Sequence, residues 1–84
     1  MSDATGVRAA VEVLAKALAD RKDAVRVTES QQKQGTLIEV FVAPDDVGKL
    51  LGRQGRTVAA LRTLASIAGE RDGKSITLEI RESR

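Results

Sequence analysis

An α+β fold with the element order helix, strand, strand, helix, helix, strand is the structure that the sequence predicts. Apolar residues recur at three- and four-residue spacing in three segments and alternate with polar residues in three others. No repeat or linker divides the chain, so residues 1–84 are expected to form one domain. Burying each apolar helix side places three helices on one face of a three-stranded sheet. The two-helix connection is long enough to make the last two strands parallel, whereas the first two form an antiparallel hairpin, so the sheet is mixed.

The first half of the chain contains the first helix and the hairpin. The helix is expected to end near Asp20, because its apolar period stops there. Residues 25–29 alternate as a strand, the polar residues 30–35 form the hairpin loop, and residues 36–43 form a second strand that Pro44 terminates. The apolar stripe of the helix comprises Val7, Ala10, Val11, Leu14, Ala17 and Leu18, and the buried face of the second strand comprises Ile38, Val40 and Val42.

The second half contains two helices and the last strand. A short helix opens on acidic residues, as the helix dipole favours, and covers residues 45–51. A further helix begins after Gly55 and ends before a turn at residues 70–73. Residues 75–80 alternate between apolar and polar side chains and form the third strand. The stripe of the longer helix comprises Val58, Leu61, Leu64, Ala65 and Ala68.

The composition argues against several classes of function. The chain has no cysteine and no histidine, so it lacks the commonest transition-metal ligands, the usual general base near neutral pH and a thiol nucleophile. No acid–base or nucleophile constellation stands out, and we expect neither enzymatic activity nor a cofactor. The N-terminus does not resemble a secretory signal, and no apolar run approaches the roughly 20 residues that span a bilayer. These features predict a soluble, cytoplasmic protein with no membrane partner.

Positive charge is concentrated in the middle of the chain. The formal net charge is only +2, but residues 47–69 contain no acidic residue. The cationic residues of that window are Lys49, Arg53, Arg56 and Arg62. A local positive field of this kind is more informative than the small overall excess, because it indicates where an anionic partner would bind.

The spacing Gly-x-x-Gly lies inside this positive window, between the two adjacent helices. Gly52 and Gly55 allow a tight turn and a close backbone approach to a ligand, and the N–H groups at the start of the following helix favour an anion. Arg53, Gln54 and Arg56 add groups that bind phosphate. The predicted ligand is therefore a phosphodiester chain, with an apolar wall for bases that some of Leu50, Leu51 and Val58 would provide.

These residues resemble the signature of KH domains, an aliphatic residue followed by Gly-x-x-Gly and two further aliphatic residues at three-residue spacing. Leu51, Gly52, Gly55, Val58 and Leu61 match it. The element order is similar to the type II KH fold, and the chain resembles small bacterial proteins that consist of a single KH domain. The resemblance covers the whole chain.

The resemblance implies that the protein binds single-stranded RNA and holds about four nucleotides. The implied RNA-binding residues are the loop Gly52, Arg53, Gln54 and Gly55, the assisting cations Lys49 and Arg56, the groove floor Leu50, Leu51 and Val58, and Ile76 at the strand that borders the groove. The family also implies an RNA chaperone linked to cell-wall synthesis and cell shape. Such proteins act as a homodimer or pair with a larger KH-containing RNA-binding protein.

Other interpretations remain open at this point. Gly52 would also suit a left-handed cap in a plain helix–turn–helix connection, and Arg53 and Arg56 would also suit a solvated surface. A KH fold that serves as a protein-interaction or dimerisation adaptor, with little RNA binding, is a second functional class. Because Phe41 is the only aromatic residue, a sheet platform that stacks bases on exposed rings is disfavoured.

Overall fold

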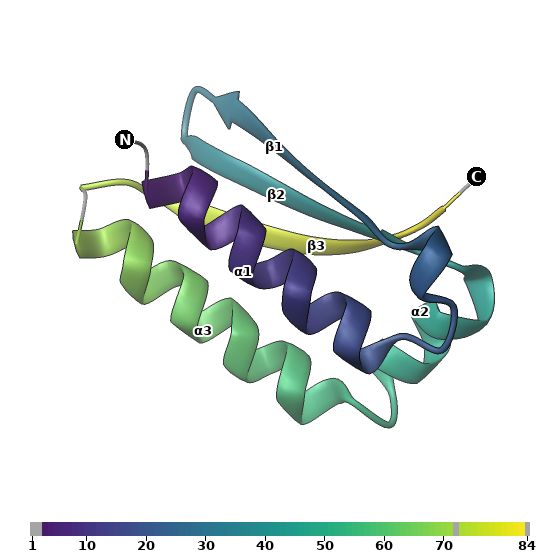
Figure 1. The fold of residues 1–84 in the computed structure, drawn as a ribbon. Coiled ribbons are helices and arrows are strands. Elements are labelled where there is room, and N and C mark those ends of the chain that lie inside the picture. Colours follow the sequence, from purple (N-terminus) through teal and green to yellow (C-terminus); the bar gives the residue numbers. More distant parts are fainter. Residues whose placement is uncertain (1–2, 72, 84) are drawn as a thin grey trace.

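Two layers, one of strands and one of helices, make up the computed structural model, which describes residues 3–71 and 73–83 (Figure 1). The predicted α+β order and the mixed three-stranded sheet are confirmed. The elements are α1 (Asp3–Leu18), a 3-10 turn η1 (Lys22–Ala24), β1 (Arg26–Gln32), β2 (Gly35–Val42), α2 (Pro44–Leu51), α3 (Gly55–Arg71) and β3 (Ile76–Glu82). Helices α1 and α3 lie side by side across the sheet, and α2 lies at the end where β2 finishes.

The sheet has β2 in its centre, paired antiparallel with β1 and parallel with β3. Its register brings Val27 opposite Val40, and Ile38 opposite Leu78, on the face that the helices cover. Alternate residues of β2 are buried, as period-two patterning requires when one face of a sheet packs on helices. The long crossover that makes β3 parallel to β2 consists of α2 and α3, with the Gly-x-x-Gly loop between them.

The hydrophobic core lies between this sheet face and the two long helices. Its members come from every helix and strand, and the most deeply buried large side chains include Ile38, Leu50, Val11, Val40 and Val42. Asp46 is 1% exposed and is therefore a charged residue within an otherwise apolar interior. Buried carboxylates need partners, and those of Asp46 connect α2 to the end of α1, as described below.

The predicted apolar stripes of α1 and α3 are partly wrong. Leu14 is 43% exposed and Leu64 is 61% exposed, although both were expected in the core. Ala10 and Ala17 are exposed as well. The helices lie in one layer with solvent beyond them, so only the narrow line of each helix that faces the sheet is buried. On α1 this line includes Ala15, which was not expected there, and Ala19, directly after the end of the helix, is buried as well.

Several element boundaries also differ from those expected. The predicted loop 30–35 narrows to a turn at Lys33 and Gln34, because the polar residues before it continue the ladder of β1. Gly35 follows this turn with a φ of 141°, which L-residues with side chains rarely adopt. Helix α3 continues to Arg71, beyond the predicted end, and β3 continues to Glu82.

Candidate nucleic-acid interface

The loop between α2 and α3 is a tight connection closed by backbone hydrogen bonds. The N–H of Gly52 donates to the carbonyl oxygen of Gly48 at 2.8 Å, that of Gln54 donates to Lys49 at 2.9 Å, and that of Gly55 donates to Gly52 at 3.0 Å. Gly52 has φ −98° and ψ −84°, so it is not in the left-handed conformation. The interpretation of Gly52 as a left-handed helix cap is therefore wrong.

The two glycines of the loop differ in what surrounds them. A Cβ added at Gly52 would lie 3.0 Å from the carbonyl oxygen of Gly48, so the turn itself favours glycine there. A Cβ added at Gly55 would meet nothing within 4 Å, and the φ of Gly55 is not positive. Where the backbone angles also suit alanine, glycine loses more conformational entropy on folding than alanine does. The fold of the chain therefore gives no reason for glycine at position 55.

The first turn of α3 carries free backbone donors beside the loop. The N–H of Val58 donates to the carbonyl oxygen of Gln54 at 2.9 Å, and the Oε1 atom of Gln54 accepts a hydrogen bond from the Thr57 hydroxyl at 3.3 Å. The N–H groups of Arg56 and Thr57 lie at the helix start, where intrahelical acceptors are lacking. Together with the helix dipole, these donors favour an anion at the loop.

The cations predicted at the interface fall into two groups. Arg53 and Arg56 are exposed at the loop and at the first turn of α3, and Gln54 between them is partly buried. Lys49 lies one turn before the loop, and its Nζ atom is 2.8 Å from Oδ1 of Asp20, near the end of α1. The ammonium of Lys49 is therefore already paired with a carboxylate, whereas the two arginines face solvent.

The predicted apolar residues are also divided. Leu51 is 52% exposed beside the loop. The side chains of Leu50, Val58 and Ile76 are 1%, 2% and 8% exposed and pack in the core. Ile76 lies beside Gly69, fourteen residues along α3 from Gly55, which corresponds to about 21 Å at 1.5 Å per residue. The structure thus brings Leu51 to the loop, supports the loop with Leu50 and Val58, and keeps Ile76 distant.

A buried carboxylate holds α2, and therefore the loop, against the end of α1. The two carboxylate oxygens of Asp46 accept hydrogen bonds from the backbone N–H groups of Asp20 and Arg21, each at 3.0 Å. The hydrogen bond from Arg21, followed by that from Asp20, lowers the pKa of the Asp46 carboxyl below its ordinary value of 3.8, although burial acts in the opposite direction. The sequence indicated only a helix-start residue at this position, because no local pattern reveals a partner 25 residues away.

Arg62 was not among the predicted contact residues. It is exposed on α3, and its Nε atom donates a hydrogen bond to the carbonyl oxygen of Leu78 at 3.2 Å. This bond joins α3 to β3, the strand that borders the groove in the predicted KH arrangement. The positive window of the sequence includes Arg62, but only the folded chain shows which backbone group its guanidinium reaches.

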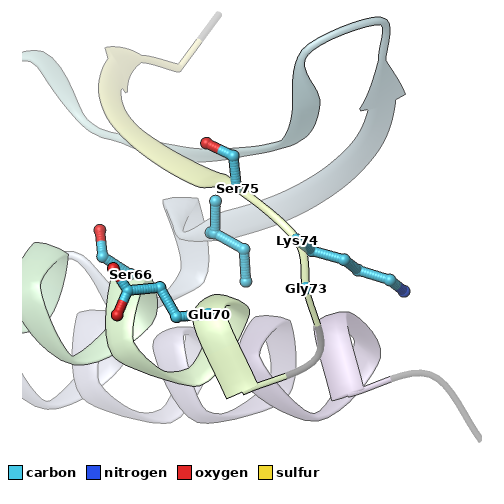
Figure 2. A pocket seen from close by; sticks show the side chains of 6 residues that line it. Ser66, Glu70, Gly73, Lys74 and Ser75 are labelled. Carbon is cyan, nitrogen blue, oxygen red and sulfur yellow. The ribbon is translucent and has the colours of Figure 1, made fainter.

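A hollow lies at the far end of α3, where the chain turns into β3. Figure 2 shows Ser66 and Glu70 from α3 on one side of it and Ser75 on the other, with the Lys74 side chain pointing away from Ser66 and Glu70. The carboxylate of Glu70 and the outward direction of Lys74 disfavour a phosphate in this hollow. The loop of residues 52–55 is therefore the better anion site.

The chain is similar to known proteins over most of its length. A family model described as "KhpA/KhpB, KH domain" matches residues 8–80. The chain is 47% identical over 72 residues to the RNA-binding protein KhpA of Aquifex aeolicus, and the aligned residues cover 86% of this chain and 91% of that protein. It is 48% identical over 71 residues to RNA-binding protein KhpA of Mycobacterium tuberculosis, covering 84% and 85% of the two chains. No solved structure matches the chain.

Two further findings concern the described residues as a whole. None of their helices is both long enough and apolar enough to cross a membrane. Within the same residues, no three Asp or Glu side chains gather where they would hold a metal ion.

Proposed function

The chain belongs to the KhpA/KhpB family of KH domains, and from this premise we propose that it binds single-stranded RNA through the loop of residues 52–55. Its relatives in Aquifex aeolicus and Mycobacterium tuberculosis carry the name RNA-binding protein and not the name of an enzyme. The tight loop, the nearby arginines and the N–H groups at the start of α3 all suit the same ligand. That ligand is a chain of phosphates with unpaired bases beside it.

Gly55 is the observation that carries this proposal. Apart from its chain neighbours and the backbone of its own helix, no atom of the described chain lies within 4 Å of the position that its Cβ would occupy, and its backbone angle is open to any residue. Alanine at this position would stabilise the fold by about 0.4–1 kcal/mol, because it restricts the unfolded chain. Glycine is favoured instead where a ligand backbone approaches the chain so closely that a methyl group would collide with it.

The proposed binding mode follows from the exposed groups around Gly55. A phosphate accepts hydrogen bonds from the first-turn N–H groups of α3, and Arg53 and Arg56 neutralise the neighbouring phosphates. Leu51, which is half-exposed, contacts the face of a base, while buried Leu50 and Val58 keep the loop in position. Backbone contacts of this kind carry little sequence information, so we infer low sequence specificity over about four nucleotides.

The wider role is inferred from the family resemblance. Weak, sequence-tolerant binding suits an RNA chaperone or post-transcriptional regulator that meets many transcripts in the cytoplasm. A link to cell-wall homeostasis and cell shape is part of the same proposal. A larger KH-containing RNA-binding protein is one proposed partner.

A second copy of the chain is the other proposed partner, and the exposed side of the helix layer supports it. Val13 and Leu14 on α1 and Leu64 and Ile67 on α3 are between 43% and 68% exposed. A groove of about 170 Å³ with an almost wholly apolar lining runs between the two helices beside Leu14 and Leu64. Exposed apolar side chains and an apolar groove on the same face suit a contact in which two copies of the chain pack through the same surface. Two linked four-nucleotide sites would also gain avidity.

The RNA proposal is tested by titrating a fluorescent, unstructured RNA oligomer with the wild type and with Arg53→Asp/Gln54→Asp. The chain offers a matched control in Lys33→Asp/Gln34→Asp, because these two residues form the exposed turn of the hairpin and undergo the same change of charge. We expect the loop variant to lose binding and the hairpin variant to retain most of it, with circular dichroism confirming that both fold. Equal loss in both variants, or in neither, would refute the loop as the RNA site.

The self-association proposal is tested by sedimentation of Leu64→Glu. A charge on the apolar face should convert a dimer to a monomer, whereas Ser66→Glu, on the side of α3 that faces the start of β3, should not. A wild type that remains monomeric at high concentration contradicts the proposed self-association. If the wild type forms dimers but binds no RNA at low salt, the adaptor function replaces RNA binding.

A further inference from the structure

One cation beside the loop is held by a carboxylate from another part of the chain. The Nζ atom of Lys49 lies 2.8 Å from Oδ1 of Asp20, and the two residues are 29 positions apart. The side chain of Lys49 is only 22% exposed, whereas that of Asp20 is 75% exposed. The carboxylate therefore accepts a hydrogen bond from the ammonium, and a phosphate that binds Lys49 has to compete with it.

The position of Asp20 is fixed by its backbone. Its N–H donates to Oδ1 of Asp46, a side chain that is 1% exposed, so the carboxylate is presented from an anchored turn and not from a loose loop. Lys49 is anchored as well, because its carbonyl oxygen accepts the N–H of Gln54 inside the loop. Both partners of the ion pair are thus attached to the elements that hold the candidate RNA site.

We propose that Asp20 competes with RNA phosphate for Lys49 and thereby limits the affinity of the loop. This inference rests on the proposed RNA binding and names the residue that tunes it. A phosphate that reaches Lys49 displaces the carboxylate of Asp20, which returns to water and takes up a cation. The exchange breaks the ion pair of Asp20 with Lys49 and leaves the carboxylate beside the RNA backbone, so each binding event gains less than a free lysine would provide.

The exchange has a specific signature in salt-dependent binding. Each phosphate neutralised on a single strand contributes about 0.7 to the slope of log K against log salt concentration, through the counterions released. Cation uptake by Asp20 offsets part of that release in the wild type. Asp20→Asn removes the competitor and keeps the backbone N–H that Asp46 binds, so the fold is expected to persist.

The test is a titration of a short unstructured RNA at several salt concentrations with the wild type, Asp20→Asn, and the matched control Asp23→Asn. Asp23 is exposed on the same connection and pairs only loosely, at 3.9 Å, with Arg21. We expect Asp20→Asn to raise the affinity about two- to five-fold, the range of an exposed ion pair, and to steepen the slope by up to about 0.7. Asp23→Asn should raise the affinity less, because this substitution alters only the long-range electrostatic field.

Lys49→Gln completes the cycle. If the exchange operates, Asp20→Asn has no more effect than Asp23→Asn in the Lys49→Gln background. The proposal is overturned if Asp20→Asn leaves the affinity unchanged, if Asp23→Asn produces an equal gain, or if the gain persists without Lys49. RNA binding that depends on Arg53 and Gln54 but not on Asp20 overturns the exchange alone. Absence of any RNA binding by the wild type overturns the proposed function together with the exchange.

Discussion

Replacing Asp46 with alanine should remove most of the connection between α2 and the end of α1. The substitution abolishes two hydrogen bonds of 3.0 Å from the N–H groups of Asp20 and Arg21 to a charged acceptor. Bonds of this kind contribute about 1.5–3 kcal/mol each. Because Asp20 and Arg21 are exposed, water can replace the lost acceptor, and we expect a net loss of about 2–3 kcal/mol.

That loss is large for a chain of 84 residues, whose whole stability is about 4–13 kcal/mol at the usual 0.05–0.15 kcal/mol per residue. Thermal unfolding followed by circular dichroism should show a midpoint about 10–20 °C below that of the wild type. Asp45→Ala is the control, since Asp45 has the same charge in the same helical turn but is exposed. Midpoints for the two variants that agree within error would refute the anchoring role of Asp46.

Three further predictions concern pH and glycine. The stability difference between the wild type and Asp46→Asn should be constant above about pH 4 and shrink as the pH falls through the lowered pKa of Asp46, because this carboxyl stabilises the fold only while it is ionised. Denaturant titrations across pH 2–7 measure the difference, and a difference that grows in acid contradicts the prediction. Gly55→Ala should stabilise the fold by about 0.4–1 kcal/mol and weaken RNA binding, and unchanged affinity in the titration would contradict the close approach of a ligand. Gly35→Ala should destabilise the fold by at least about 2 kcal/mol, since the new Cβ would collide with the carbonyl oxygen of Ser75 and the φ of residue 35 is 141°. Gly73→Ala, at a φ of 69° but in open surroundings, should lower the thermal unfolding midpoint less, and equal losses would argue against the collision.

The sequence predicted the order of elements and the mixed sheet because periodicity and connection length are local properties. It could not predict which part of an apolar stripe is buried. Leu64 fits the helical period as well as Ala65 does, yet the first is 61% exposed and the second is 3% exposed. The difference depends on where α1 lies beside α3, which is a property of the packed layer. Likewise, the polar residues before Lys33 extend β1 only because β2 offers them a partner.

The candidate site shows the same division. The loop and its arginines were visible in the sequence, because glycine spacing, charge and helix boundaries are all read along the chain. The pairing of Lys49 with Asp20 and the anchoring of α2 by Asp46 join positions 25 to 29 residues apart, and no pattern in one sequence reports such contacts. The separation of Ile76 from the loop follows from the length of α3, once that helix is known to continue past Gly69.

The hydrogen bond from Arg62 to Leu78 also has a consequence for the edge of the sheet. Strand β3 lies at one side of the sheet, where a strand from another molecule could add to the ladder and begin an aggregate. The guanidinium of Arg62 occupies the carbonyl oxygen of Leu78, and α3 lies beside the strand. Charged side chains and a covering helix are two of the ways in which the edge of a sheet resists strand addition. The carbonyl oxygen of Leu78, once bonded to Arg62, is less available to an added strand.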